Sequence, residues 1–238
     1  MNYEEKIDVL DKGFVTLVES TPNADLLSVN AARVSFGKKK TKITKGDEKL
    51  IQYLIKHHHD SPFRHSHITF RIKAPEFIMR QWYKHVVGIS YSDGKGMREI
   101  DHGWNEISGR YVEYEDEFYY PEKFRKQSED NKQATINESI DKEDEAREVF
   151  KKSVKSSYES YKNLLEMGVG KEIARSVLPL NFYTEVVWTA SLQALLNFIT
   201  LRSHEGSQYE ISLYAEAIKE LVRKVAPVTL KAWEDANR

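Results

Sequence analysis

The complete absence of cysteine is the feature that most limits what this 238-residue chain can fold into. Without thiols, neither disulfides nor a thiolate zinc site can hold the fold together, and no cysteine can act as a nucleophile. The fold must therefore be stabilised by buried apolar side chains, and 238 residues are enough for a substantial core. Apolar residues make up 40% and charged residues 31%, which is typical of a soluble globular protein, and the length favours one domain.

The chain carries no sequence signal for export or membrane insertion. No window reaches the eighteen or so apolar residues that cross a bilayer, and the N-terminus lacks the basic-then-apolar order of a signal peptide. We therefore expect a cytoplasmic location and no membrane partner. The net charge of −1 is uneven, because residues 113–148 hold thirteen Asp or Glu against six Lys or Arg. The modestly basic remainder suits phosphate-bearing small ligands as well as nucleic acid, so a nucleic acid polymer is only a minor possibility.

Strand and helix patterns both occur along the chain. Alternating apolar residues predict strands at 13–20 and 67–72, and helical spacing predicts helices at 47–58, from Pro75 to His85, at 143–167, at 185–201 and at 209–225, with a short helix within 21–36. The helix at 185–201 is so apolar that it should lie in the core or at a subunit interface. Residues 90–103 are rich in glycine and turn formers, and residues 121–142 are polar and without periodicity, so we expect a loop and a mobile surface segment there.

Five histidines lie within eleven positions, at His57, His58, His59, His65 and His67. A zinc site needs three ligands on converging side chains, but three consecutive histidines at a helix end point in different directions. Histidine is also favoured at a helix C-terminus by the helix dipole. We therefore favour polar residues at a helix end over cofactor contacts, and we expect no metal site, although a metal stays open as the third interpretation.

Four arginines lie beside apolar helices or strands rather than in charged loops: Arg80, Arg110, Arg175 and Arg202. A salt bridge is the better interpretation of each one alone, but four together favour a phosphate-binding site. The turn Ser108–Gly109–Arg110 could offer a hydroxyl and a guanidinium to one phosphate, while nothing indicates that Ser108 is a hydrolase nucleophile. The chain contains no Rossmann or Walker-type glycine pattern, so a dinucleotide would have to bind in another mode.

Several sequence blocks together resemble the flavin-dependent thymidylate synthase (ThyX-type) family in order and spacing. The resemblance covers roughly residues 45–230 and is strongest in the C-terminal third. The blocks are HDSPFRH (59–65), RQWYKHV (80–86), NEISGRY (105–111), EIARSVLPLNFYTEVVWT (172–189) and LRSHEGSQYEI (201–211).

The resemblance implies a single domain spanning residues 1–238, with an α+β fold built from a mixed or antiparallel sheet and several helices. It also implies a homotetramer in which each active site is built from several subunits. The expected reaction converts dUMP to dTMP, with 5,10-methylenetetrahydrofolate as carbon donor, FAD as cofactor and NADPH or NADH as reductant. No enzyme nucleophile attacks the base in such a reaction, which agrees with the lack of cysteine that the other class of thymidylate synthase needs.

The resemblance also assigns residues to the two ligands. Arg202 matches a catalytic arginine that favours ionisation at N3 of the pyrimidine, a role that fixed positive charge can supply. The positions that match dUMP contacts are Gln81, Trp82, Tyr83, Lys84, Glu106, Ile107, Ser108, Gly109, Arg110, Arg175 and Arg202. The positions that match FAD contacts are His59, Ser61, Lys84, His85, Val86, Glu106, Ser191, Leu192, Gln193 and Asn197.

The chain departs from the family pattern in the flavin site. The family's Arg-His-Arg is Lys84, His85 and Val86 here, an insertion of about 87–103 follows, and Ser191 and Gln193 stand where the family commonly carries asparagine and arginine. Loss of an arginine removes a cation and up to five donors, for which Lys95 or Arg98 of the insertion could substitute. These departures leave alternatives open: a relative making another 5-substituted dUMP such as hydroxymethyl-dUMP, a non-catalytic nucleotide-binding module, and a metal hydrolase.

Overall fold

The computed structural model of the chain describes residues 5–85 and 103–237. Five strands form one sheet in the order β1-β2-β3-β7-β4, and β5 and β6 form a separate hairpin. The strands are β1 (Glu5–Val9), β2 (Gly13–Ser20), β3 (His67–Pro75), β4 (Gly103–Glu106), β5 (Arg125–Gln127), β6 (Thr135–Ser139) and β7 (Tyr183–Ser191). The helices are α1 (Ala24–Arg33), α2 (Lys45–Lys56), α3 (Glu76–Trp82), α4 (Glu143–Glu166), α5 (Lys171–Ala174), α6 (Leu192–Arg202), α7 (Tyr209–Val225) and α8 (Pro227–Ala236), with 3-10 turns η1 (Val34–Phe36), η2 (Ser61–Arg64) and η3 (Arg175–Val177). Separate helices around an antiparallel sheet confirm the predicted α+β class.

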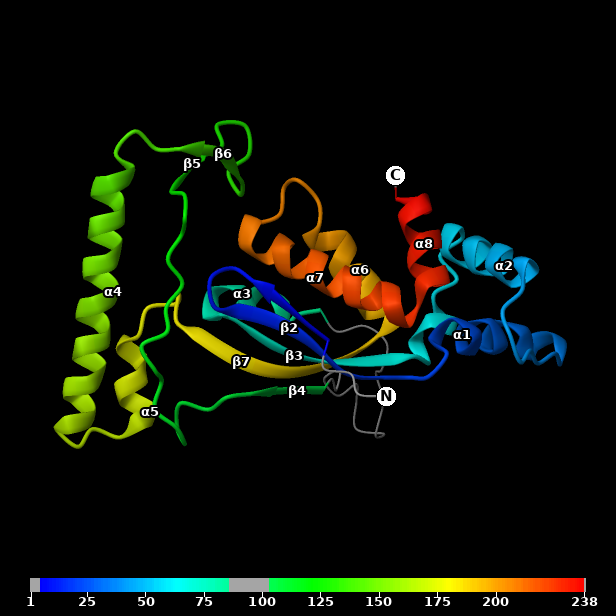
Figure 1. Cartoon of the computed structure of the whole chain (residues 1–238), viewed down its shortest axis with the longest axis horizontal. Coiled ribbons are helices and arrows are strands. Elements are labelled where there is room, and N and C mark those ends of the chain that lie inside the picture. The colour runs from blue at the N-terminus through cyan, green and yellow to red at the C-terminus, as the bar shows by residue number, and fades with distance from the viewer. Residues whose placement is uncertain (1–4, 86–102, 238) are drawn as a thin grey trace, which may run out of the picture.

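One face of the sheet is buried under α3, α6 and α7 (Figure 1). The buried side chains of the two central strands pair across β3 and β7 as Ile68 with Ala190, Phe70 with Trp188, and Ile72 with Val186. Above them the rings of Trp82 and Phe198 stack with centroids 4.7 Å apart. The opposite face is polar: Thr69 and Thr189 share a hydrogen bond of 2.9 Å, and Arg71 pairs with Glu185. The alternation of apolar and polar residues along each strand therefore decides which face takes the helices.

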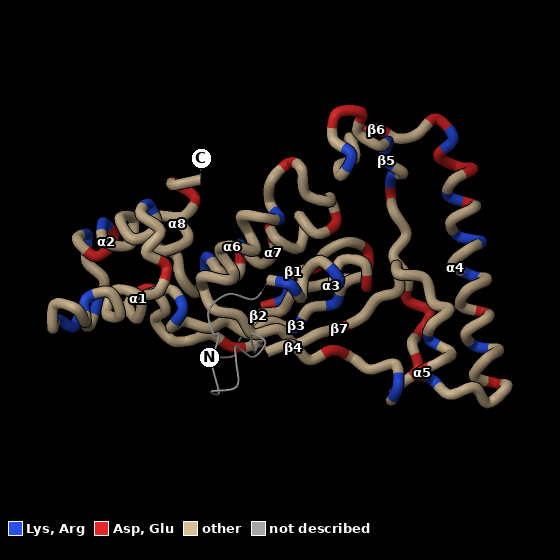
Figure 2. The backbone as a smooth tube through the Cα atoms, turned by 180° about the vertical axis from the view of Figure 1, so that it is seen from behind, with Lys and Arg blue, Asp and Glu red and all other residues tan. Residues whose placement is uncertain are grey.

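Two groups of helices lie at opposite ends of the sheet (Figure 1). At one end, Asp25 of α1 caps α8 by accepting hydrogen bonds from the backbone N–H groups of Val228 and Thr229, both 2.9 Å long. At the other end, α4 packs against α5 and η3 around a second, smaller core. Figure 2 shows charged residues of both signs along α4, whereas α6 carries only Arg202. Within the described residues, no helix is both long and apolar enough to cross a bilayer.

Most of the elements expected from apolar periodicity are present in the structure. The strand at 13–20 is β2, and the strand at 67–72 is β3, which runs on to Pro75. The helices expected within 21–36, at 47–58, after Pro75, at 143–167 and at 209–225 are α1, α2, α3, α4 and α7. Helix α4 ends before Gly168, whose φ of +85° is the left-handed conformation that commonly terminates helices.

The helix predicted at 185–201 is wrong in its first half. Residues Tyr183–Ser191 form β7, the strand between β3 and β4, and the helix α6 begins only at Leu192. The error arises because a buried strand runs directly into a buried helix, so apolar residues predominate on both sides of the boundary. Ser191 marks that boundary by accepting a hydrogen bond from the Ala194 backbone N–H at 3.2 Å. The expectation that α6 lies in the core is confirmed, since Leu192, Leu195 and Ile199 have no exposed surface.

Two other expectations are corrected by the structure. Residues 121–142 contain the β5-β6 hairpin rather than only irregular chain, and Arg125 joins this hairpin to α7 through Glu210 at 2.6 Å. Helix α8 is absent from the predicted elements, although Pro227 at its first position is a typical sequence signal for a helix start. The loop expected at 90–103 and the insertion at 87–103 lie outside the described residues, except for Gly103.

Candidate functional site

A cavity of about 810 Å³ lies at the β4 edge of the sheet, between the start of α3 and the α5–η3 segment. Ile107 is anchored there because its backbone N–H donates to the Glu185 carbonyl oxygen at 2.9 Å. The chain then turns at Ser108, whose carbonyl oxygen accepts from the Tyr111 backbone N–H at 2.9 Å. Five predicted nucleotide contacts line this cavity: Glu106, Ile107, Ser108, Arg110 and Arg175.

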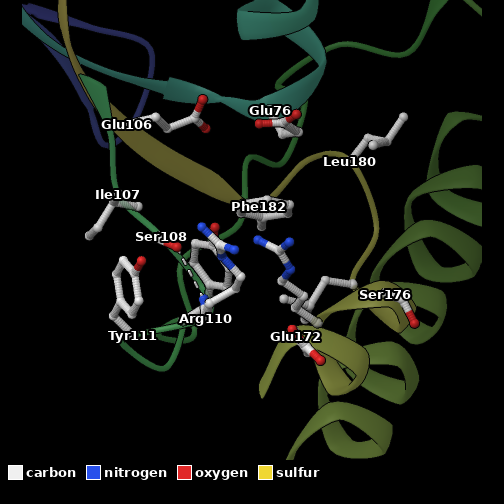
Figure 3. A pocket seen from close by; sticks show the side chains of 13 residues that line it. Glu76, Glu106, Ile107, Ser108, Arg110, Tyr111, Glu172, Ser176, Leu180 and Phe182 are labelled. Carbon is white, nitrogen blue, oxygen red and sulfur yellow. Dashed lines mark hydrogen bonds between the residues drawn. The ribbon is translucent and has the colours of Figure 1, made fainter. Parts of the chain in front are cut away.

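Two guanidinium groups make one side of the cavity cationic. Arg110 reaches toward its centre from the turn after β4 (Figure 3), and its guanidinium lies 5.5 Å from the centroid of the Tyr111 ring. Arg175 begins η3 and reaches the same cavity from a segment 65 positions further along the chain. Ser108 adds a hydroxyl that accepts from the Arg110 backbone N–H at 3.3 Å, and Gly109 is buried beneath the turn. Converging guanidinium groups with a hydroxyl are typical of a site for a phosphate or carboxylate.

Two glutamates form an acidic region in the same cavity (Figure 3). Thr184 donates to Oε1 of Glu106 at 2.8 Å, and the Trp104 indole N–H points to Oε2 at 3.4 Å. Glu76 begins α3 beside it, and its backbone N–H donates to the Phe182 carbonyl oxygen at 3.0 Å. Sequence reasoning missed Glu76, because an acidic residue directly after Pro75 reads as a favourable charge at a helix N-terminus. Tyr114 and Glu172, which also line the cavity, were missed as well.

A second group of predicted residues lies at the other end of α3. Arg202 donates through Nε to Nε2 of His85 at 3.1 Å and approaches the Gln81 carbonyl oxygen at 3.5 Å. Burial, followed by the charge of Arg202, lowers the pKa of His85 to about 4, so its imidazole is neutral at neutral pH. The Gln81 side chain donates to Oε1 of Gln208 at 2.6 Å. Arg202 is therefore a partly buried cation held by neutral partners.

The two groups do not line the same cavity. Gln81, Lys84, His85 and Arg202 are absent from the described lining of the 810 Å³ cavity. Gln81 follows Glu76 by five residues in α3, so the second group begins about 7.5 Å further along the helix axis. The chain thus presents an anion-binding half with Arg175 and a separate half with Arg202.

Two of the predicted contacts have fully buried side chains. Trp82 has no exposed surface and packs on Phe198, and Leu192 is also fully buried in the core. Both side chains belong to the core, and the two contact assignments stay predictions. Tyr83, by contrast, is 47% exposed, and its ring lies 6.4 Å from that of Trp104.

Some of the predicted flavin contacts lie near the start of α6, whereas His85 lies beside Arg202 and Glu106 lines the 810 Å³ cavity. Gln193 and Asn197 line a second cavity of about 730 Å³ with His58 and Asp60, while His59 and Ser61 are exposed in the adjoining segment. Gln193 accepts from Nε of Arg64 at 2.5 Å, so a guanidinium lies beside the position where the family commonly carries arginine. Sequence reasoning missed Arg64. Val86 lies outside the described residues, as do Lys95 and Arg98 of the insertion.

The histidine cluster is held by ring contacts. His57 ends α2, with its ring centroid 4.3 Å from that of Tyr53, and the His59 ring lies 5.8 Å from the same tyrosine. Among residues 5–85 and 103–237, no three His, Asp or Glu side chains are grouped to hold a metal ion. Arg80 is exposed on α3, and its charge only partly offsets the rise that burial and Glu106 cause in the pKa of Glu76.

Comparisons with known proteins point to one family. The family described as thymidylate synthase complementing protein matches residues 16–228. A flavin-dependent thymidylate synthase of Thermus thermophilus is 43% identical over 229 residues, covering 96% of this chain and 78% of the relative. The enzyme of the same name from Thermosipho africanus is 40% identical, covering 94% of this chain and 92% of its own length. The crystal structure of a UMP/dUMP methylase PolB from Streptomyces cacaoi bound with 5-Br dUMP has a TM-score of 0.81 at 29% identity, covering 96% of this chain and 97% of that one.

Proposed function

The chain belongs to the thymidylate synthase complementing protein family, and from this premise we propose that it methylates dUMP to dTMP in a flavin-dependent reaction. The observation that carries the proposal is the cavity in which Arg110 and Arg175 converge opposite Glu76 and Glu106. A nucleoside monophosphate has an anionic phosphate at one end and a neutral, hydroxyl-bearing sugar beside it. The guanidinium groups of this cavity complement the phosphate, and the carboxyl groups can hydrogen-bond to sugar hydroxyls.

In this proposal, different residues bind the phosphate, the sugar and the pyrimidine of dUMP. Arg110, Arg175 and the Ser108 hydroxyl bind the phosphate, and Glu106 accepts from the sugar. Arg202 acts on the pyrimidine, where its fixed charge stabilises the anion formed when N3 ionises. Because His85 is neutral at neutral pH, the imidazole positions the Arg202 guanidinium without competing for that anion. Gln81, Tyr83 and Lys84 complete the proposed contacts with dUMP.

The chemistry of the available donors fits FAD. Lys84, His85 and Arg64 supply cationic or N–H donors for phosphate and flavin groups, and Ser61, Gln193 and Asn197 supply neutral polar groups. His59 lies beside Ser61, and the Ser191 hydroxyl is already used to cap α6. When bound, the flavin supplies the hydride that completes the methyl group, with methylenetetrahydrofolate as the proposed carbon donor and NADPH as the proposed reductant.

We include the cytoplasmic location expected from the sequence in this proposal.

The proposal also includes a homotetramer with shared active sites. The Arg175 half and the Arg202 half lie at opposite ends of α3 in one chain, and this separation supports a site that a second subunit completes. The polar face of the sheet and its 42% exposed Val187 offer surface for such contacts.

Absorbance spectra test the proposed function directly. We expect flavin bands between about 300 and 550 nm in the purified protein or after addition of FAD, perturbed by dUMP, because both ligands share Glu106. Turnover with dUMP, methylenetetrahydrofolate and NADPH should then give dTMP by mass spectrometry. A product heavier by one oxygen would replace methylation with hydroxymethylation, and a protein that binds dUMP but no flavin would be a nucleotide-binding module instead.

A further inference from the structure

Glu76 is a titratable side chain in the nucleotide cavity that the proposed function leaves without a role. It is partly buried at the first position of α3, where Pro75 and the hydrogen bond from its backbone to the Phe182 carbonyl oxygen fix its place. Its carboxyl group lies on the same side of the cavity as that of Glu106, as Figure 3 shows. Glu106 is in turn oriented by Thr184 and Trp104. Two carboxyl groups from different elements are therefore held together at the end of a cavity whose other end is cationic.

Two adjacent carboxyl groups avoid repulsion by sharing one proton. Burial raises the pKa of Glu76 to about 7, and the charge of Glu106 and a hydrogen bond between the two groups act in the same direction, against a smaller lowering by Arg80. The other groups around the pair are Tyr114, whose pKa is raised by burial and then by Glu106, and Arg175, Arg110 and Glu172 on the remaining walls. Below pH 7 the Glu76 carboxyl group is therefore mostly protonated and offers an O–H donor beside Glu106.

We propose that Glu76 is a nucleotide-binding residue, which together with Glu106 holds the sugar of a nucleoside monophosphate through one shared proton. The carboxyl pair matches a sugar hydroxyl, because a hydroxyl group can donate to a carboxylate and accept from a carboxylic acid at the same time. The assignment rests on the proposed function, since it takes Arg110 and Arg175 as the phosphate site. Loss of the shared proton puts a second negative charge into the cavity that already holds the phosphate, and binding weakens.

The test compares wild type with Glu76→Gln, because the amide keeps the size and the donor but has no proton to lose. The dissociation constant of dUMP is measured by calorimetry at pH 6.0 and 8.5. We expect the two proteins to match at the lower pH and wild type to bind about tenfold more weakly than Glu76→Gln at the higher pH. Ionisation of dUMP itself affects both proteins equally and cancels in the ratio. Glu172→Gln, which removes another carboxylate from the same cavity, should retain the wild-type dependence on pH.

The outcomes separate this assignment from the proposed function. If wild type binds no dUMP at either pH, the proposed function fails. If wild type binds dUMP and Glu76→Gln shows the same pH dependence, only the role of Glu76 is rejected. Infrared difference spectra of wild type give a second reading that does not depend on a variant folding. We expect the carbonyl band of a protonated carboxyl group to disappear between pH 6.0 and 8.5 and to shift when dUMP is added; a spectrum without that band overturns the assignment.

Discussion

Gly13 stands where the first hairpin closes against α7, and no side chain fits there. A Cβ atom on Gly13 would lie 1.9 Å from the Tyr214 hydroxyl oxygen and 2.8 Å from the Lys73 carbonyl oxygen, and that hydroxyl donates a hydrogen bond to that carbonyl. We expect Gly13→Ala to lower the free energy of unfolding by about 1–3 kcal/mol, measured by chemical denaturation, because overpacking forces this contact apart. Gly46→Ala is the matched control, since a Cβ there meets only Thr44 at 3.8 Å. It should be neutral or stabilising, and equal losses in the two variants would contradict the explanation.

His85 gives the protein a stability that depends on pH. Its pKa is lowered to about 4 by burial and by Arg202, whereas an unfolded histidine titrates near pH 6.5. Between these values the unfolded chain binds the extra proton, so the free energy of unfolding falls as pH drops from about 6.5 to 4. We expect a loss of about 2 kcal/mol between pH 7 and 4.5 in wild type relative to His85→Gln. Chemical denaturation at both pH values measures it, and identical losses in the two proteins would exclude His85 as the cause.

At the residue scale, the resemblance predicts Arg110 and Arg175 as contacts of one ligand, together with Glu106, Ile107 and Ser108, but not Glu76, Tyr114 and Glu172 of the same cavity. Arg110 and Arg175 are far apart in sequence, and the structure brings both to one cavity. Glu76 could not be identified from the sequence, because its role depends on its contact with Glu106, thirty positions later. A glutamate at the start of a helix is also explained by its favourable interaction with the helix dipole. Trp82 and Leu192 are sequence neighbours of other proposed contacts, and the burial of their side chains in the core could not be read from the resemblance.

At the scale of elements, periodicity identified isolated helices and strands and failed where two buried elements join. Apolar residues predominate on both sides of the boundary between β7 and α6, and Ser191, as a helix cap, marks the change. The β5-β6 hairpin has few apolar residues and is held by Arg125 instead, so no periodic signal exists to be read.

The Arg125–Glu210 pair joins three elements and is itself buried. The Glu210 side chain is 4% exposed and also accepts from Tyr119 at 3.1 Å and from Gln208 at 3.0 Å. Glu210→Gln leaves the guanidinium without its counter-charge, so we expect the free energy of unfolding to fall by about 2–4 kcal/mol. Hydrogen exchange should also accelerate across β5 and β6. Glu159→Gln, in an exposed pair with Lys155, is the control and should change stability by less than about 0.5 kcal/mol. A similar change in both variants would mean that the hairpin is held by other contacts.

At the scale of the whole molecule, the order of the matching sequence blocks carried more information than any local pattern. The family implied an α+β fold, and the antiparallel sheet agrees with it. No feature of the sequence alone could show that the Arg175 half and the Arg202 half are separated by α3, because that separation depends on how β4 and β7 pair at the sheet edge. The proposed assembly follows from this separation rather than from any apolar face.

Mixing two inactive variants tests whether active sites are shared between subunits. Arg175→Ala and Arg202→Ala each remove one half of the proposed site, so each homo-oligomer should be inactive. The two variants are then mixed in equal amounts and reassembled into oligomers. If each site takes its two halves from different chains, about a quarter of the sites contain two intact halves, and dTMP formation should recover to roughly that fraction of wild type. Arg110→Ala mixed with Arg175→Ala is the control, because both variants damage the same half and no site can be complete. Recovery in the first mixture alone requires halves from different chains, whereas no recovery in either mixture would mean that each chain builds its own site.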